Sequence, residues 1–138
     1  MRIRKHILPV IVIAQFFCTS VWFAGNAVLP DMTASLGLPL GLLARFTIMV
    51  QAGFIVGTFG FAVLAIADRF SPVKVFFFSA VTAAFFNYFL SFSEIGLNGL
   101  LICRFLTGFF LAGIYPVGMK IAADYYEVGL GKSLGYLV

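Results

Sequence analysis

Four long apolar segments constrain this chain more than any other feature of its sequence. They cover approximately residues 7–29, 43–67, 73–92 and 97–122, and a fifth begins near residue 133. Each has about 20 residues or more, enough at ~1.5 Å per residue to cross the ~30 Å hydrocarbon core of a bilayer. None alternates in polarity as a barrel strand would, and the short connections favour antiparallel neighbours. The sequence predicts an all-α integral membrane protein with four antiparallel transmembrane helices and the start of a fifth.

Composition excludes a soluble domain. Apolar residues make up 62% of the 138 residues and charged residues 10%, against about 45–50% and 25% in globular proteins. A short chain has too little interior to hide so much apolar surface, so the lipid bilayer is the expected partner. The net charge of +4 comes from scattered residues, which gives no indication of nucleic-acid binding. Cys18 and Cys103 lie in apolar runs without any metal-ligand spacing, so we expect neither a metal nor another cofactor.

The distribution of Lys and Arg predicts the orientation. One side of the membrane receives Arg45 with the acids Asp31 and Glu94. The other side receives seven basic residues, namely Arg2, Arg4, Lys5, Arg69, Lys74, Lys120 and Lys132. Basic residues accumulate on the cytoplasmic side. The chain is therefore expected to be a multi-pass protein of the cell inner membrane with a cytoplasmic N-terminus.

Polar residues recur at helical spacing in three of the segments, so that they share a face within each. The residues that we assign on this basis to a solute or ion pathway are Arg104, Gln15, Thr19, Asn26, Gln51, Thr107 and Tyr115. The first and fourth segments are expected to line a cavity. The third segment is mostly Phe, Val and Ala, and it is expected to be the most exposed to lipid.

Arg104 is the most informative single residue. An Arg at the centre of a spanning helix costs about 2.5–3.5 kcal/mol on insertion scales, and intramembrane cations usually mark an ion or substrate path. The alternative is that its long stem carries the charge to the headgroups. Thr107, Gly108 and Tyr115 make its face semi-polar, which favours a guanidinium directed into a central cavity.

Small residues and prolines predict local packing. Pro30 and Asp31 are expected to close the first helix, and Pro116 to kink the fourth by removing a backbone bond to Ala112. Glycines at small-xxx-small spacing favour close helix contacts. The glycines that we assign to helix packing are Gly53, Gly57, Gly60, Gly108 and Gly113.

Three stretches resemble signatures of the major facilitator superfamily (MFS). Residues 64–74 resemble its loop 2–3 pattern, Gly-x-Leu-Ala-Asp-Arg-x-Gly-Arg-Lys, although Leu64 and Ser71 stand at its two glycines. Residues 104–108 resemble the Arg-x-x-x-Gly pattern of its helix 4, and residues 123–135 resemble its loop 4–5. The order and spacing of all three agree with the family.

This resemblance implies a secondary transporter and not an enzyme. Such proteins have two six-helix bundles and move a small solute by alternating access, in some cases with a coupling proton or ion. The chain would be an N-terminal fragment of the first bundle, with the missing C-terminal helices as its partner. The resemblance assigns a conformational gating motif to Asp68, Arg69, Lys74, Asp124 and Lys132.

Two other functions stay open on the residues alone. A complete four-helix exporter acting as an oligomer would resemble small multidrug exporters, which carry an acid in helix 1 that residues 7–29 lack. A membrane scaffold that transports nothing would have no evident use for Arg104.

Overall fold

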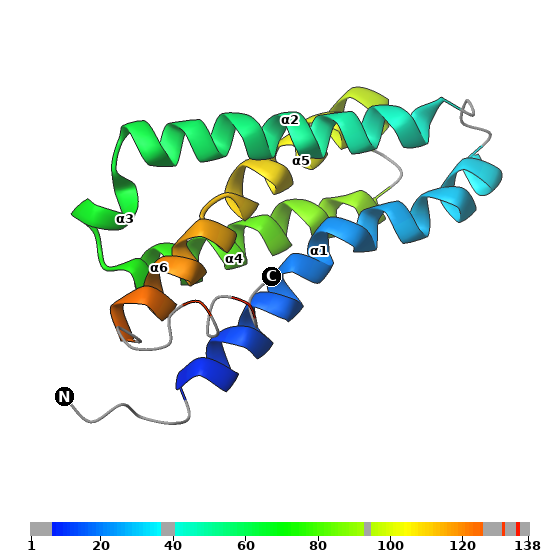
Figure 1. Cartoon of the computed structure of the whole chain (residues 1–138). Coiled ribbons are helices and arrows are strands. Elements are labelled where there is room, and N and C mark those ends of the chain that lie inside the picture. The colour runs from blue at the N-terminus through cyan, green and yellow to red at the C-terminus, as the bar shows by residue number, and fades with distance from the viewer. Residues whose placement is uncertain (1–6, 37–40, 93–94, 126–130, 132–134, 136–138) are drawn as a thin grey trace.

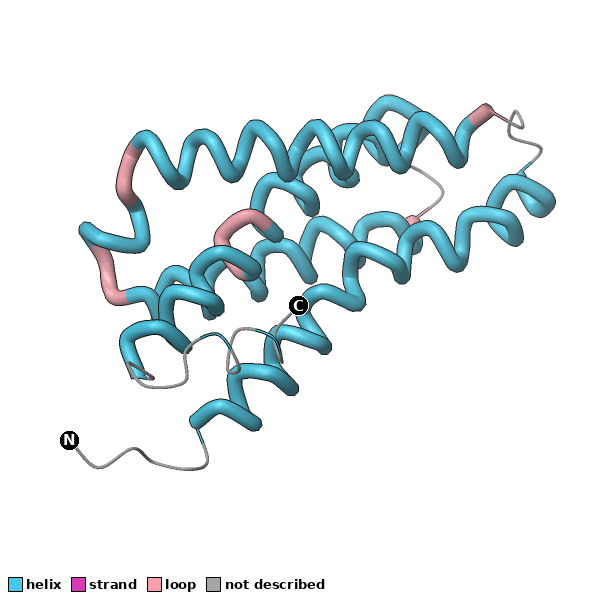
Figure 2. The backbone as a smooth tube through the Cα atoms, in the orientation of Figure 1, coloured by secondary structure: helices cyan, strands magenta, loops and turns pink. Residues whose placement is uncertain are grey.

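The computed structural model describes residues 7–36, 41–92, 95–125, 131 and 135, and every element in this part of the chain is helical. The elements are α1 (Ile7–Leu36), α2 (Leu42–Val63), α3 (Ile66–Arg69), α4 (Pro72–Tyr88), the 3-10 helix η1 (Phe89–Ser91), α5 (Gly96–Leu111) and α6 (Tyr115–Tyr125) (Figure 2). Four helical stretches are long and apolar enough to cross a membrane, namely Ile7–Val28, Leu42–Val63, Pro72–Ser91 and Gly96–Tyr125. The predicted all-α membrane fold is confirmed. The start of a fifth helix near residue 133 lies outside the described residues.

The four spans run in alternating directions. The N-terminal end of α1, the short helix α3 and the C-terminal end of α6 lie at one end of the bundle, on the left in Figure 1. The C-terminal end of α1, η1 and the N-terminal ends of α2 and α5 lie at the other end. Each span therefore runs antiparallel to the span before it, from one end of the bundle to the other, as expected for short connections.

Helix α1 continues past the point where the sequence predicted its end. Pro30 was expected to close the helix at residue 29, yet α1 runs through Pro30 to Leu36. A proline removes one backbone donor and disturbs a single turn, so it bends a helix as readily as it ends one. The hydroxyl of Thr33 donates to the carbonyl oxygen of Pro30 at 2.8 Å in this added stretch.

Helix α2 ends earlier than predicted. It was expected to reach residue 67 but ends at Val63, and Ala65 adopts a left-handed conformation with φ 48°. Such a residue ends a helix and is usually glycine. The chain then turns through α3 into α4, which begins with Pro72 in its first turn, where a missing N–H costs little.

The fourth span is interrupted. It was predicted as one helix over residues 97–122, but the backbone forms a turn at residues 112–114 that separates α5 from α6. The N–H groups of Gly113 and Ile114 bond three residues back, to Phe110 and Leu111, both at 3.0 Å. Pro116 has no N–H to offer the carbonyl of Ala112, so the predicted kink is confirmed as a break.

Helices α2, α4 and α5–α6 pack around three layers of buried apolar side chains. One layer joins Leu42, Phe46, Leu90 and Leu100; the middle layer joins Val50, Ala83, Leu111 and Ile114; the third joins Val75, Val117 and Ile121. The large side chains that face outward are also apolar, including Phe16, Phe59 and Phe78, each at least 66% exposed. A chain that is apolar inside and outside suits a lipid solvent.

The least buried span is α1, and not α4 as the sequence suggested. Within the most apolar 18-residue stretch of each span, 6% of residues are buried in α1 and 22% in α4. Packing of α4 against both α5 and α6 covers one of its sides. Its Phe and Val content did not reveal this, because the packed side of a membrane helix is as apolar as its lipid-facing side.

Candidate functional site

Arg104 on α5 is enclosed by polar groups from two other helices. One terminal nitrogen, Nη2, donates to the backbone carbonyl oxygen of Trp22 at 2.9 Å and to Oδ1 of Asn26 at 3.0 Å, both on α1. The other, Nη1, donates to Oδ1 of Asn87 on α4 at 3.3 Å. The whole residue is 0% exposed. A single guanidinium, with donors in a planar fork, thus ties three helices together.

This placement differs from both sequence-based alternatives. The guanidinium neither reaches the headgroups nor faces an open cavity, because its terminal nitrogens are bonded to α1 and α4. The Nε of Arg104 is buried and has no hydrogen-bond partner among the described residues. Burying a cation in this way is tolerable only where the acceptors are already in place.

Gly25 makes room for the guanidinium. A Cβ added at Gly25 would overlap Nη1 and Cζ of Arg104. The sequence analysis missed the roles of Gly25 and of Asn87. A signal for Gly25 was available in the sequence. Gly25 is a small residue directly before the hydrogen-bond acceptor Asn26, on the helix that faces Arg104. No spacing rule links Asn87 to Arg104 across two helices.

An apolar cavity of about 250 Å³ lies where α1, α2 and the junction of α5 with α6 meet. Thr19 and Tyr115, two of the predicted pathway residues, are in its wall. The rings of Trp22 and Phe54 meet there edge to face, with centroids 5.5 Å apart. The full lining is Thr19, Trp22, Phe23, Phe54, Leu111, Ile114 and Tyr115. The cavity therefore lies between the polar face of α1 and the break that separates α5 from α6.

The other predicted pathway residues are dispersed. Gln15 is buried, with 3% of its surface exposed, and its amide oxygen lies against Gly118 of α6. Thr107 is buried on α5 and donates its hydroxyl to the carbonyl oxygen of Cys103 at 2.8 Å. Gln51 is exposed on α2 and does not line this cavity.

The predicted gating residues lie at the end of the bundle that holds α3. Asp68 forms an ion pair with Lys120 of α6. The side chain of Asp68 is 69% exposed and that of Lys120 is 32% exposed. Asp124, four residues after Lys120 on α6, is exposed near the end of that helix. Arg69 and Lys74 are exposed and border a second groove. Lys132 lies outside the described residues.

Three of the predicted packing glycines bring α2 and α5 into backbone contact. A Cβ at Gly53 would overlap the carbonyl oxygen of Phe105, one at Gly57 that of Phe109, and one at Gly108 that of Val50. Gly113 lies against Ser79 and Phe61. Gly60, however, lies outside this contact. A Cβ added at Gly60 would have no described atom of another helix within 4 Å. Its assignment to helix packing therefore stays a prediction, because no described residue packs against it.

The described residues hold no group of three His, Cys, Asp or Glu side chains that could bind a metal ion.

Residues 11–138 match the family model of the Major Facilitator Superfamily. The chain belongs to the Major Facilitator Superfamily. No curated protein and no solved structure matches it. As an MFS chain it is a multi-pass membrane protein of the transporter type, with the lipid bilayer and a small solute as partners.

Proposed function

We propose that this MFS chain belongs to a secondary active transporter that moves a small solute by alternating access, with a proton or ion as a coupling partner. In the family, solute binds between two bundles that rock about it. On that basis, further helices of the same protein complete the cavity described above.

The observation that carries the proposal is the position of the cavity at a helix break. Leu111, Ile114 and Tyr115, which flank or lie in the turn at residues 112–114, all line it. Discontinuous helices form the substrate sites of many secondary transporters, because their freed backbone groups can meet a polar ligand. Irregular backbone at membrane depth is tolerated where it is buried in protein or lines a cavity.

The side chains of the cavity suit a small, partly apolar solute. Thr19 and Tyr115 offer hydroxyl groups, and Trp22 and Phe54 offer aromatic surfaces. We propose that Gln15 and Asn26 mark the α1 face along which the pathway continues, and that Gln51 meets it from α2. In this proposal Arg104 acts on transport by holding α1 to α4 and α5, and not by binding the solute.

The ion pair between Asp68 and Lys120 is proposed as a gate contact. It joins the turn after α2 to the end of the broken span. Exposed ion pairs are worth at most about 1 kcal/mol, so this one opens easily when the helices move. Arg69, Lys74, Asp124 and Lys132 are proposed to belong to the same cluster.

The proposed orientation places this cluster in the cytoplasm. Arg69, Lys74 and Lys120 lie at the end of the bundle that holds α3, whereas Arg45 and Asp31 lie at the opposite end (Figure 1). The excess of basic residues at the first end supports a cytoplasmic N-terminus.

Labelling of single cysteines tests alternating access without knowledge of the solute. We would replace Cys18 and Cys103 by Ser in the protein expressed from its complete gene, and introduce Thr19→Cys. Because the cavity opens to each side in turn, an impermeant maleimide should label position 19 from both faces of the membrane.

Two matched positions serve as controls. Phe17→Cys lies on the outer surface of α1, where residue 17 is 65% exposed, and lipid should protect it from both faces. Ser71→Cys, after α3, should react only from the cytoplasm. If position 19 reacts from one face alone while position 71 behaves as expected, the alternating-access proposal is wrong and a static membrane protein is favoured.

A further inference from the structure

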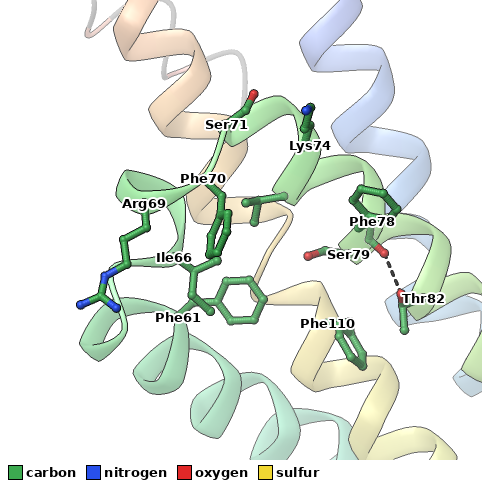
Figure 3. A pocket seen from close by; sticks show the side chains of 11 residues that line it. Phe61, Ile66, Arg69, Phe70, Ser71, Lys74, Phe78, Ser79, Thr82 and Phe110 are labelled. Atoms are coloured by element: carbon green, nitrogen blue, oxygen red, sulfur yellow. Dashed lines mark hydrogen bonds between the residues drawn. The ribbon is translucent and has the colours of Figure 1, made fainter.

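A second groove lies apart from the cavity that Thr19 lines, and the two share no lining residue. It has a volume of about 480 Å³ and opens between the end of α2, α3, α4 and α5 (Figure 3). Its position between the spans Leu42–Val63 and Pro72–Ser91 puts its upper end at the membrane surface and its lower end within the bilayer. Of the residues that line it, only Arg69 and Lys74 are also assigned to the gate cluster.

The surface end of the groove is basic. Arg69 and Lys74 stand on its two sides in Figure 3, with Ser71 at the upper end, and their charged ends project from the rim. None of the lining residues is acidic. The nearest acid in sequence, Asp68, is paired with Lys120 and does not neutralise Arg69.

The same end of the groove holds the N-terminus of α4, a helix of 17 residues. Ser71 is its N-cap residue and makes no capping bond with its side chain. The N–H groups of Val73 and Lys74 belong to the first turn, where no intrahelical acceptor exists. A helix N-terminus with free N–H groups beside a Lys favours a phosphate.

Deeper in the groove lies the hydroxyl of Ser79. Ser79 is only 4% exposed and lines the groove, and its hydroxyl makes no hydrogen bond to any described residue, unlike that of Thr82, which donates to the carbonyl oxygen of Phe78 at 2.7 Å. Figure 3 shows the Ser79 oxygen directed into the space between the aromatic rings. A hydroxyl that lines the groove can donate to a ligand acceptor at this depth.

The remainder of the wall is apolar. Phe70 and Phe78 are 64% and 66% exposed, and Phe61 and Phe110 face them from α2 and α5. From the surface inward the groove thus presents cations and free N–H groups, then a hydroxyl, then aromatic rings. A glycerophospholipid presents its groups in the same order, with a phosphate, ester carbonyl oxygens and acyl chains.

We propose that this groove binds one anionic phospholipid. Its phosphate lies at the N-terminus of α4 between Arg69 and Lys74, an ester carbonyl accepts from Ser79, and one acyl chain lies along Phe70 and Phe78. A free phosphate would leave the aromatic wall unused. A zwitterionic lipid would gain less from two cations and a helix N-terminus, because its own ammonium group opposes them.

Native mass spectrometry of the purified full-length protein tests this. The protein would be titrated separately with phosphatidylglycerol, phosphatidylcholine and inorganic phosphate. One phosphatidylglycerol should bind at least 10-fold more tightly than phosphatidylcholine. The double variant Arg69→Gln/Lys74→Gln should weaken it roughly 30-fold, since each cation near an anionic headgroup contributes roughly 5-fold.

Matched variants separate the groove from the rest of the surface. Arg45→Gln removes an exposed cation at the opposite end of the bundle and should change binding less than 2-fold. Phe78→Ala should weaken binding roughly 5-fold through lost acyl-chain contact. Phe77→Ala, at a neighbouring residue that is 60% exposed but outside the groove, should not.

Three outcomes would overturn the proposal. Equal loss on Arg45→Gln and on the double variant would show attraction by net charge alone. Binding of inorganic phosphate with the affinity of the lipid would show an anion site without a lipid. Unchanged binding by the double variant or by Phe78→Ala would show that the groove has another occupant, such as a further helix of the protein.

Discussion

The contact between α2 and α5 and the contact between α1 and the rest of the bundle are built in opposite ways. Glycines let α2 and α5 approach until backbone meets backbone, at Gly53 and Gly108 for example. Helix α1 has 6% of its most apolar stretch buried, against 56% for the span that contains α5 and α6. The polar contact of Arg104 with Trp22 and Asn26 ties α1 to this span.

The difference follows from the solvent. Lipid is as apolar as Leu, so membrane helices associate through close van der Waals packing or through hydrogen bonds and not through the exclusion of water. Backbone packing of the first kind is lost abruptly when two helices separate by even a small distance. A few hydrogen bonds, in contrast, can break and form again elsewhere. We infer that α2 and α5 move as one body.

The largest expected effect comes from breaking the rigid contact. Gly53→Val places a side chain where the carbonyl oxygen of Phe105 lies, and the backbone of α5 cannot yield as a flexible side chain would. Overpacking typically costs about 1–3 kcal/mol, and we expect the upper end of that range where the neighbouring atom is backbone. We expect little folded protein on size-exclusion chromatography after detergent extraction. Gly60→Val is the matched control on the same helix, and it should behave as wild type because the space around Gly60 is open.

The sequence predicted the spans well because span length is fixed by bilayer thickness, which hydropathy reads directly. It predicted the helix ends less well. Pro30 lies inside α1 and Ala65 ends α2 in a conformation that usually requires glycine. Both outcomes depend on whether neighbouring turns stay helical, which a single proline or alanine does not determine.

The sequence also showed that Arg104 is costly to bury, but it did not show which groups Arg104 binds. Spacing along a helix shows which residues share a face, and it does not show which helix that face meets. The carbonyl of Trp22 and the amide of Asn87 carry no signal in the sequence that points to Arg104. The partner of Lys120 carries no such signal either, because Asp68 is near it in space but 52 residues away along the chain.

A smaller effect is expected from releasing α1. Arg104→Ala removes three hydrogen bonds, each worth about 0.6 kcal/mol on average within membranes, so we expect a loss of about 2 kcal/mol in the free energy of unfolding. Transport by the full-length protein should be nearly abolished while insertion and expression persist. Thermal denaturation and solute uptake measure the two effects separately.

Arg104→Lys sharpens this test, because Lys keeps the charge but cannot bond α1 and α4 in one planar fork. It should restore part of the stability and little of the transport. Gly25→Ala should act in the same direction as Arg104→Ala, since its Cβ would displace the guanidinium. Normal transport by Arg104→Ala would contradict the idea that Arg104 couples α1 to α5.

The smallest effect on stability is expected at the ion pair between Asp68 and Lys120. Both side chains are partly or largely exposed, so Asp68→Asn should change the free energy of unfolding by less than about 1 kcal/mol, and added salt should reduce even that. Its effect on access should be larger, because a gate contact contributes to one conformation and not to the other. We expect Asp68→Asn to increase labelling of Thr19→Cys from one face and decrease it from the other. Exchange of the two charges, Asp68→Lys with Lys120→Asp, should restore the wild-type ratio, whereas a ratio that never changes would show that this pair is not a gate contact.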